Sequence, residues 1–243
     1  MSTIPVIAGY AAKVCFPKAR RLGLIVPALG ALMFGLLSRA LEDSPEEALA
    51  LIVGQGLFGV VLPIGCLIIG DAVLGSEIRT GTMHFTWLSP AGFRSIVLGR
   101  WLTGTAVAII ALAIPCALAA VVAGVPDGAA TLGFAAAMGA SAYIAVFILL
   151  GAMTRRAVVW SLALVVLLER LLGQALSGIA QWCPGWVARF VYGDMGPDAE
   201  RLLRDGVPAG GEAVTRLILI TVVALFLASR RLAKLRLSGP TDD

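Results

Sequence analysis

The chain has 243 residues, of which 59% are hydrophobic and 14% are charged, and its formal net charge is +4. A soluble domain of this size carries about 25% charged residues, so the composition excludes an ordinary soluble domain and indicates an integral membrane protein. We attribute the net positive charge to the membrane topology described below, and we therefore expect no nucleic-acid partner.

Residues 1–21 precede the first apolar stretch, and Ile7, Ala11 and Val14 recur there at helical spacing among cationic residues. This pattern predicts an amphipathic helix on the cytoplasmic membrane surface, with a frayed basic tail as the alternative. The segment lacks the short apolar core and the Ala-x-Ala site of a cleaved signal peptide.

Six apolar stretches of about 20 residues follow, and this length is the signature of membrane-spanning helices. They are Leu22–Ser38, Leu51–Leu74, Trp101–Ala123, Thr131–Ala152, Ala157–Ala180 and Val214–Ser229. Pro27, Pro63 and Pro115 fall inside the first three, where membrane helices tolerate kinks. The sequence therefore predicts an all-α integral membrane protein with one six-span domain, residues 22–229, and a cytoplasmic tail, 230–243.

The positive charges predict the orientation of these spans. With the N-terminus inside, thirteen of the nineteen Lys and Arg residues lie on the cytoplasmic side. Cytoplasmic loops carry such an excess, so both termini are expected in the cytoplasm, and a bacterial plasma membrane is the expected location. Of the four cysteines only Cys183 would face the oxidising side, which predicts no disulfide within one chain. Their spacing matches no metal site.

The loop between the second and third spans, residues 75–100, is polar and rich in turn residues. We expect the second helix to end at Gly81, which adopts a left-handed cap easily, and a short helix to cross the tip over Thr82–Leu88. Ser89 and Pro90 form an N-cap and a first-turn proline, which predict a helix leading into the third span. The apolar tip would lie on the membrane or in a pocket of another protein. The candidate contact residues are Glu77, Gly81, Thr82, Met83, His84, Trp87, Leu88, Ser89 and Pro90.

The fifth span carries two adjacent ionisable residues, Glu169 and Arg170. Such groups near the bilayer centre cost at least about 2.5 kcal/mol each, so they are expected to face the bundle interior or water. One stripe at multiples of four carries Ser161, Glu169, Gly173 and Ser177. We expect this stripe to line the translocation path or a subunit interface, and a structural hydrogen bond to a neighbouring helix is the alternative. Arg170 is expected to point away from the stripe, toward Gln174.

The longest outer loop, residues 181–213, follows the fifth span. Trp182, Trp186 and Phe190 are four residues apart, which places them on one helical face at the level of the headgroups. The sequence predicts a short interfacial or re-entrant helix that begins near Pro184, followed by a solvated stretch over 198–205.

Several catalytic patterns are missing from the sequence. A phosphate-binding Walker loop needs Gly-Lys, and the three lysines follow Ala12, Pro17 and Ala233. The single histidine, His84, excludes a His-Glu-x-x-His zinc site. We therefore expect a chain that is no enzyme by itself and holds no cofactor or metal.

The segment from Gly70 to Arg100 resembles the permease subunits of ABC-2 type ABC transporters, through Glu-x-x-x-Gly-Thr, then Ser-Pro, then Gly-Arg. In that family this stretch holds the coupling helix, which docks into the ATPase subunit. Glu77, Gly81, Thr82, Ser89, Pro90 and Gly99 match the pattern, and Arg100 stands where the family often has Lys. Leu167–Leu172 and Trp182-Cys-Pro-Gly-Trp186 are similar to the Glu-bearing helix and the Trp-x-Pro turn of bacterial members.

The resemblance implies an ATP-driven exporter of a lipid, a peptide or a hydrophobic drug. The chain would form a homodimer, or pair with a second permease subunit, within the lipid bilayer. Two copies of a separate ABC ATPase would hold ATP and Mg. Two other functions stay open: an ion- or proton-coupled secondary transporter that uses Asp71 and Glu169 as carriers, and a non-transporting immunity protein.

Overall fold

The computed structural model describes residues 9, 18–41, 45–75, 92–154, 156–197 and 199–234. These residues are almost all helical, and no strand occurs among them. Six helices are long and apolar enough to cross a membrane, which confirms the predicted helical multi-span fold. They cover Leu22–Ala40, Glu47–Leu74, Phe93–Ala123, Pro126–Met153, Ala157–Ala175 and Gly210–Ala233.

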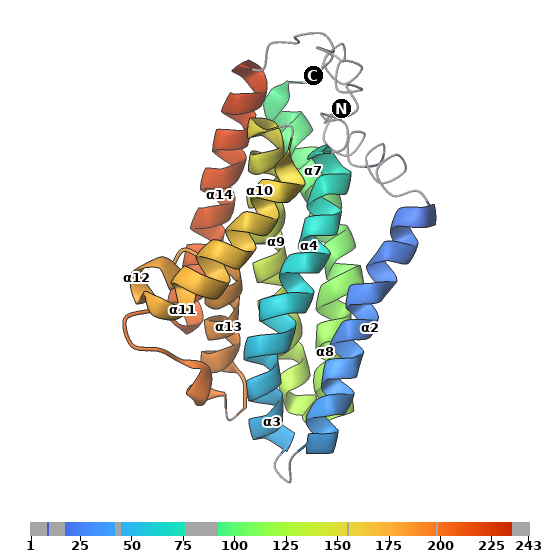
Figure 1. Ribbon diagram of the computed structural model, residues 1–243, viewed down its shortest axis with the longest axis vertical. Helices are drawn as coiled ribbons and strands as arrows, with labels where there is room; N and C mark the ends of the chain where they lie inside the picture. The colour runs from blue at the N-terminus through green and yellow to red at the C-terminus, as the bar shows by residue number, and fades with distance from the viewer. Residues whose placement is uncertain are drawn as a thin grey trace.

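Most spans are built from several consecutive helical segments (Figure 1). The first span is α2 (Lys18–Leu41), and the second joins α3 (Pro45–Ile52), the π-helical η1 (Val53–Val61), α4 (Leu62–Gly70) and η2 (Asp71–Gly75). The third joins α7 (Phe93–Ala108), η3 (Ile109–Ala113) and α8 (Ile114–Ala123), and the fourth joins η4 (Pro126–Gly128) and α9 (Ala129–Met153). The fifth joins α10 (Ala157–Ala163), η5 (Leu164–Leu172) and α11 (Gly173–Ala175). Then follow α12 (Ser177–Ala180), α13 (Pro184–Met195), η6 (Glu200–Leu202) and the last span, α14 (Gly210–Lys234).

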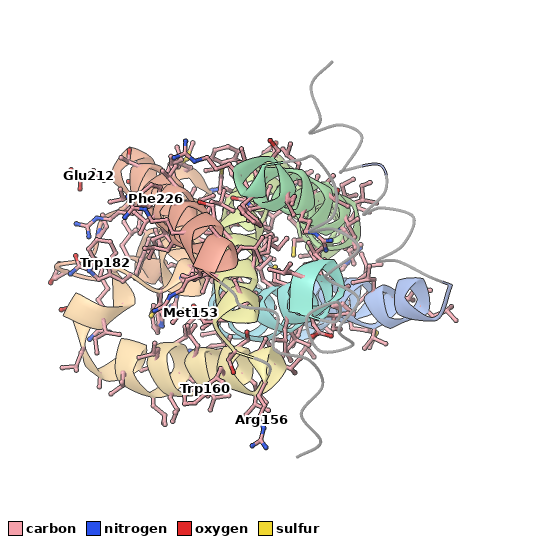
Figure 2. All side chains as sticks on the ribbon, turned by 90° about the horizontal axis from the view of Figure 1, so that it is seen from above. Met153, Arg156, Trp160, Trp182, Glu212 and Phe226 are labelled. Atoms are coloured by element: carbon pink, nitrogen blue, oxygen red, sulfur yellow. The ribbon has the colours of Figure 1, made fainter. Side chains whose placement is uncertain are left out.

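Helix α9 lies at the centre of the bundle and packs against α4, α7, α8, α13 and α14 (Figures 1 and 2). Its small residues permit this central position. A Cβ added at Gly139 would lie 2.7 Å from the Ala188 Cβ of α13, so the two helices approach closely only because Gly139 has no side chain. Small residues at a helix interface permit such close approach in membrane proteins.

Two of the three predicted proline kinks coincide with π-helical turns. Pro63 follows η1 and Pro115 follows η3, whereas Pro27 lies within an α-helical segment. A proline has no N–H, and its ring clashes with the carbonyl four residues earlier, so the preceding turn widens. The widened turn leaves backbone carbonyls available to other donors.

The ends of the helices divide between the two ends of the bundle (Figure 1). At the upper end of that view lie the last residues of the second span, of α9 and of α14, together with the start of α7. Arg94, Arg100, Arg156, Arg230 and Arg231 lie in or beside these helix ends. The predicted N-terminal amphipathic helix lies outside the described residues apart from Gly9 and residues 18–21.

Two predicted helix limits are wrong. Gly92 has an extended backbone, with φ −65° and ψ 147°, so the third span starts at Phe93 and does not run on from Ser89 and Pro90. The fifth span ends at Ala175, because Leu176 is extended, with φ −124° and ψ 112°. The predicted solvated stretch is also only partly exposed, since Leu202 of η6 is buried.

Candidate functional site

The predicted contact residues of the loop between the second and third spans, Glu77 to Pro90, lie outside the described residues. The two helix ends beside this loop are described, and Arg100 connects them. Arg100 is 1% exposed, and its Nη1 donates a hydrogen bond to the Val73 carbonyl at the end of the second span. This bond ties the second and third spans together within two turns of the start of α7.

The described candidate residues surround Glu169 on the inner face of the fifth span. The buried positions of this span recur every four residues, at Ala157, Ser161, Val165, Glu169 and Gly173. Glu169 is 4% exposed. The predicted inward orientation of the Glu169 stripe is confirmed for Ser161, Glu169 and Gly173.

Ser177 does not belong to this stripe. The helix breaks at Leu176, so Ser177 lies on the separate short helix α12, and its side chain is half-buried. The prediction assumed one unbroken helix through residue 180. Position 176 is a leucine, so no glycine or proline there signals the break.

Two helices supply donors to the Glu169 carboxylate. The Tyr143 hydroxyl of α9 donates to Oε2, and the Gly185 backbone N–H of α13 donates to Oε1 at 3.3 Å. The indole Nε1 of Trp186 donates to the Glu169 backbone carbonyl at 2.9 Å. Glu169 therefore joins the fourth span, the fifth span and α13 inside one chain.

The Glu169 carboxylate takes the place of an N-cap for α13. Cys183 occupies the N-cap position and its side chain makes no capping bond, and Pro184 fills the first helical position without an N–H. The next free N–H is that of Gly185, which an N-cap side chain ordinarily satisfies. Glu169 accepts it instead, and its negative charge at a helix N-terminus is favourable.

Glycine is required at position 185 because three groups meet there. A Cβ at this position would lie 3.0 Å from Glu169 Oε2 and 3.1 Å from the Phe58 carbonyl oxygen, and closer still to the Tyr143 hydroxyl. The absence of a side chain lets the start of α13 reach the carboxylate.

Arg170 points away from the stripe and binds the second span, and it lines the same cavity as Gln174. Its Nε donates to the Gly59 carbonyl at 3.1 Å, while Nη1 and Nη2 donate to the Gln55 side-chain and backbone oxygens at 3.2 and 2.9 Å. Gly59 lies four residues before Pro63, so its carbonyl lacks the α-helical donor that any other residue at 63 would supply. The guanidinium supplies that missing donor.

The same groups line a cavity of about 20 Å³. It is lined by Gln55, Phe58, Gly59, Glu169, Arg170, Gln174, Gly185, Trp186 and Arg189. A water molecule needs about 10–15 Å³, so the cavity has room for a water-sized group and not for a lipid or a peptide. The Arg189 guanidinium lies 5.0 Å from the centre of the Trp186 ring, and burial lowers the pKa of this arginine.

The predicted aromatic face after the fifth span holds for Trp186 and Phe190, whose ring centroids lie 5.9 Å apart, and not for Trp182. A helix does begin at Pro184, as expected, but Trp182 lies before it, is 51% exposed and stacks with Arg216. Phe190 is fully buried, and Trp186 binds Glu169. Trp186 and Phe190 therefore pack together on α13, while Trp182 lies apart from them.

Sequence reasoning missed Tyr143, Gly185, Gln55 and Gly59, which complete the cluster around Glu169 and Arg170. Two signals were present: a proline four residues after Gly59, and a Pro-Gly helix start without a capping side chain before it. Among the described residues, no group of three His, Cys, Asp or Glu side chains is arranged to hold a metal ion.

No protein-family model matches the chain, and no curated protein matches it.

Proposed function

We propose that this chain is the membrane-spanning permease subunit of an ABC-2 type exporter, driven by a separate ATPase. The observation that supports this most directly is the position of the two described helix ends that flank the loop between the second and third spans. Both lie at the end of the bundle where the helix-terminal arginines gather, and Arg100 bonds the two spans near these ends.

The arginines also support the proposed orientation. Membrane proteins keep Lys and Arg on the cytoplasmic side, so the upper end of the bundle in Figure 1 is assigned to the cytoplasm. The loop with the family motif is then available to a cytoplasmic ATPase. The opposite end carries Glu47 and Arg201, which pair at 2.7 Å between exposed side chains.

In this proposal, ATP-driven closure of two ATPase subunits pushes on the Thr82–Leu88 segment. The bond between Arg100 and Val73 makes the second and third spans move together, and a hydrogen bond from Trp101 to the Ser141 carbonyl of α9 passes the movement to the bundle centre. The chain contributes different contacts to two ATPase states and no chemistry of its own. The cargo is a lipid, a peptide or a hydrophobic drug, moved at the interface of two permease copies.

Within this proposal Glu169 is a positioning residue. Its carboxylate is enclosed by its own chain and bonded to Tyr143 and Gly185, which favours the structural alternative over a place in the translocation path. Arg170 has the same role toward the second span.

The test is co-purification of the ATPase in mild detergent. The Met83→Asp/Trp87→Asp double variant is expected to lose the ATPase subunit, because two charges would enter an apolar contact. The matched control is Met195→Asp/Trp182→Asp: the same residue types, about half exposed, in the segment between the fifth and the last span. It is expected to keep the ATPase.

Unchanged co-purification of the Met83→Asp/Trp87→Asp variant would contradict the docking assignment. Transport that needs no ATPase and stops with a protonophore would instead identify an ion-coupled transporter. Protection of cells from a toxic peptide by the chain alone, without export, would identify an immunity protein.

A further inference from the structure

We propose that the groove between α7 and α14 is a binding site for one anionic phospholipid. The groove has a volume of about 300 Å³, and its apolar walls are formed by Val97, Leu98, Val222, Leu225 and Phe226, with Arg94 at one end. Below it is called the α7–α14 groove. The inference is independent of the proposed export function, since it concerns the outer surface of the bundle.

Two guanidinium groups lie at the same end of this groove. Arg94 lies one residue after the start of α7 and lines the groove itself. Arg230 lies near the end of the antiparallel α14, and its guanidinium carbon is 4.4 Å from the centre of the Phe226 ring, which forms part of the wall. Neither arginine pairs with a carboxylate of the described residues. The groove is thus cationic at one end and apolar along its length.

Helix length places this cationic end at the headgroup level. The third span has 31 residues, which at 1.5 Å per residue is roughly 46 Å. The hydrocarbon core is about 30 Å thick, and the bilayer with headgroups about 40–45 Å, so the first turn of α7 lies among the headgroups. Arg94 is then at the depth of a lipid phosphate, while Leu98 and Val222 lie at the depth of acyl chains.

The charge pattern selects a lipid over a second copy of the chain. A symmetric dimer through this groove would bring Arg94 and Arg230 of both copies together, and like charges repel. A phosphate satisfies both guanidiniums, and an acyl chain covers the exposed Phe226 and Val222, which are 45% and 58% exposed. Basic pockets between membrane helices bind anionic headgroups in this way.

The chain contains a natural control groove. Leu24, Ile25, Leu29 and Ile110 line a second groove of about 360 Å³ between α2 and the third span, and its lining residues are all apolar. It offers nothing to distinguish one headgroup from another. We expect it to accept neutral and anionic lipids equally, whereas the α7–α14 groove prefers the anionic lipid.

The experiment uses the full chain in nanodiscs made of phosphatidylcholine. Each sample also contains a trace of a photoreactive lipid, which is either phosphatidylglycerol or phosphatidylcholine with a photoreactive acyl chain. Cross-linked peptides are located by mass spectrometry, and the ratio of phosphatidylglycerol to phosphatidylcholine labelling is compared between the two grooves. The ratio is expected to exceed one in the α7–α14 groove and to equal one in the apolar groove. A cation near an anionic headgroup contributes a factor of about five, so Arg94→Gln and Arg230→Gln should each lower the ratio about five-fold.

Arg231→Gln is the matched charge control. It removes an exposed arginine from the same turn of α14, about 100° around the helix from Arg230, and should leave the ratio unchanged. An equal loss in Arg231→Gln, or equal labelling by both lipids in the wild-type chain, would overturn the proposal. Absence of lipid label from the groove would show that a protein covers it. Competition by soluble glycerol phosphate would show that the ligand is a free phosphate.

Discussion

The contact between Arg170 and the second span allows a quantitative test of how the proline kink is stabilised. Pro63 leaves the Gly59 carbonyl without an α-helical donor, and Arg170 Nε donates to it at 3.1 Å. If the guanidinium replaces the missing N–H, restoring that N–H should reduce the contribution of the guanidinium to the free energy of unfolding. A double-mutant cycle between Arg170→Met and Pro63→Ala measures this coupling.

Hydrogen bonds between membrane helices contribute about 0.6 kcal/mol on average and at most about 1.7 kcal/mol. We therefore expect Arg170→Met to cost about 0.6 to 1.7 kcal/mol less in the Pro63→Ala background than in the wild-type background. Methionine keeps most of the side-chain volume and removes every donor. The free energy of unfolding is measured by tryptophan fluorescence during reversible denaturation in mixed micelles with sodium dodecyl sulfate.

Pro115 provides the control for this cycle. It also follows a π-helical turn, but the carbonyl four residues before it belongs to Ala111 and is not an acceptor of Arg170. Arg170→Met and Pro115→Ala should therefore be additive within about 0.5 kcal/mol. Equal coupling energies for both prolines would refute the assignment, as would strict additivity between Arg170→Met and Pro63→Ala.

Three further predictions concern the surroundings of Glu169. Gly185→Ala should destabilise the fold by about 1–3 kcal/mol, because the added Cβ would overlap three groups. Gly178→Ala is the control and should not destabilise it, since nothing lies within 4 Å of a Cβ at that position. Equal melting temperatures of the two variants in detergent would contradict this prediction. Tyr143→Phe should cost about 1–3 kcal/mol by removing a donor from the buried Glu169 carboxylate, and the same denaturation assay measures it. The Cys183 thiol should resist maleimide at pH 7.5 until the protein is denatured, because burial raises its pKa to about 12 and keeps it protonated; rapid labelling of the folded chain would be the contrary result.

The sequence predicted the features that depend on local composition. Six apolar stretches became six apolar helices because an apolar run of about 20 residues is a local property. Pro63 and Pro115 predicted kinks because the loss of an N–H is local too. The inward orientation of Glu169 followed from helical spacing and from the cost of exposing a carboxylate to lipid.

The partners of these residues could not be predicted, because they depend on how distant segments return to the bundle. Tyr143 and Gly185 reach Glu169 from α9 and α13, whose relative positions depend on close packing at Gly139. The contact of Arg170 with Gln55 and Gly59 was not predicted, because helical spacing does not show which helix lies beside η5. The error at Ser177 traces to the helix break at Leu176 in the fifth span, and the error at Pro90 traces to the extended Gly92 before the third span.

The adjacent residues Glu169 and Arg170 stabilise two different neighbours, and this division limits how a dimer could form. Glu169 faces inward to α13, and Arg170 faces the second span, so both polar groups are already occupied within one chain. The opposite face of the fifth span is apolar: Trp160 lies on the outer side of α10 in Figure 2 and is 59% exposed, and Leu167 and Leu171 are also more than half exposed. A second copy of the chain that packs on the fifth span would contact this outer face by van der Waals packing. Its formation would then leave the Glu169 hydrogen bonds unchanged.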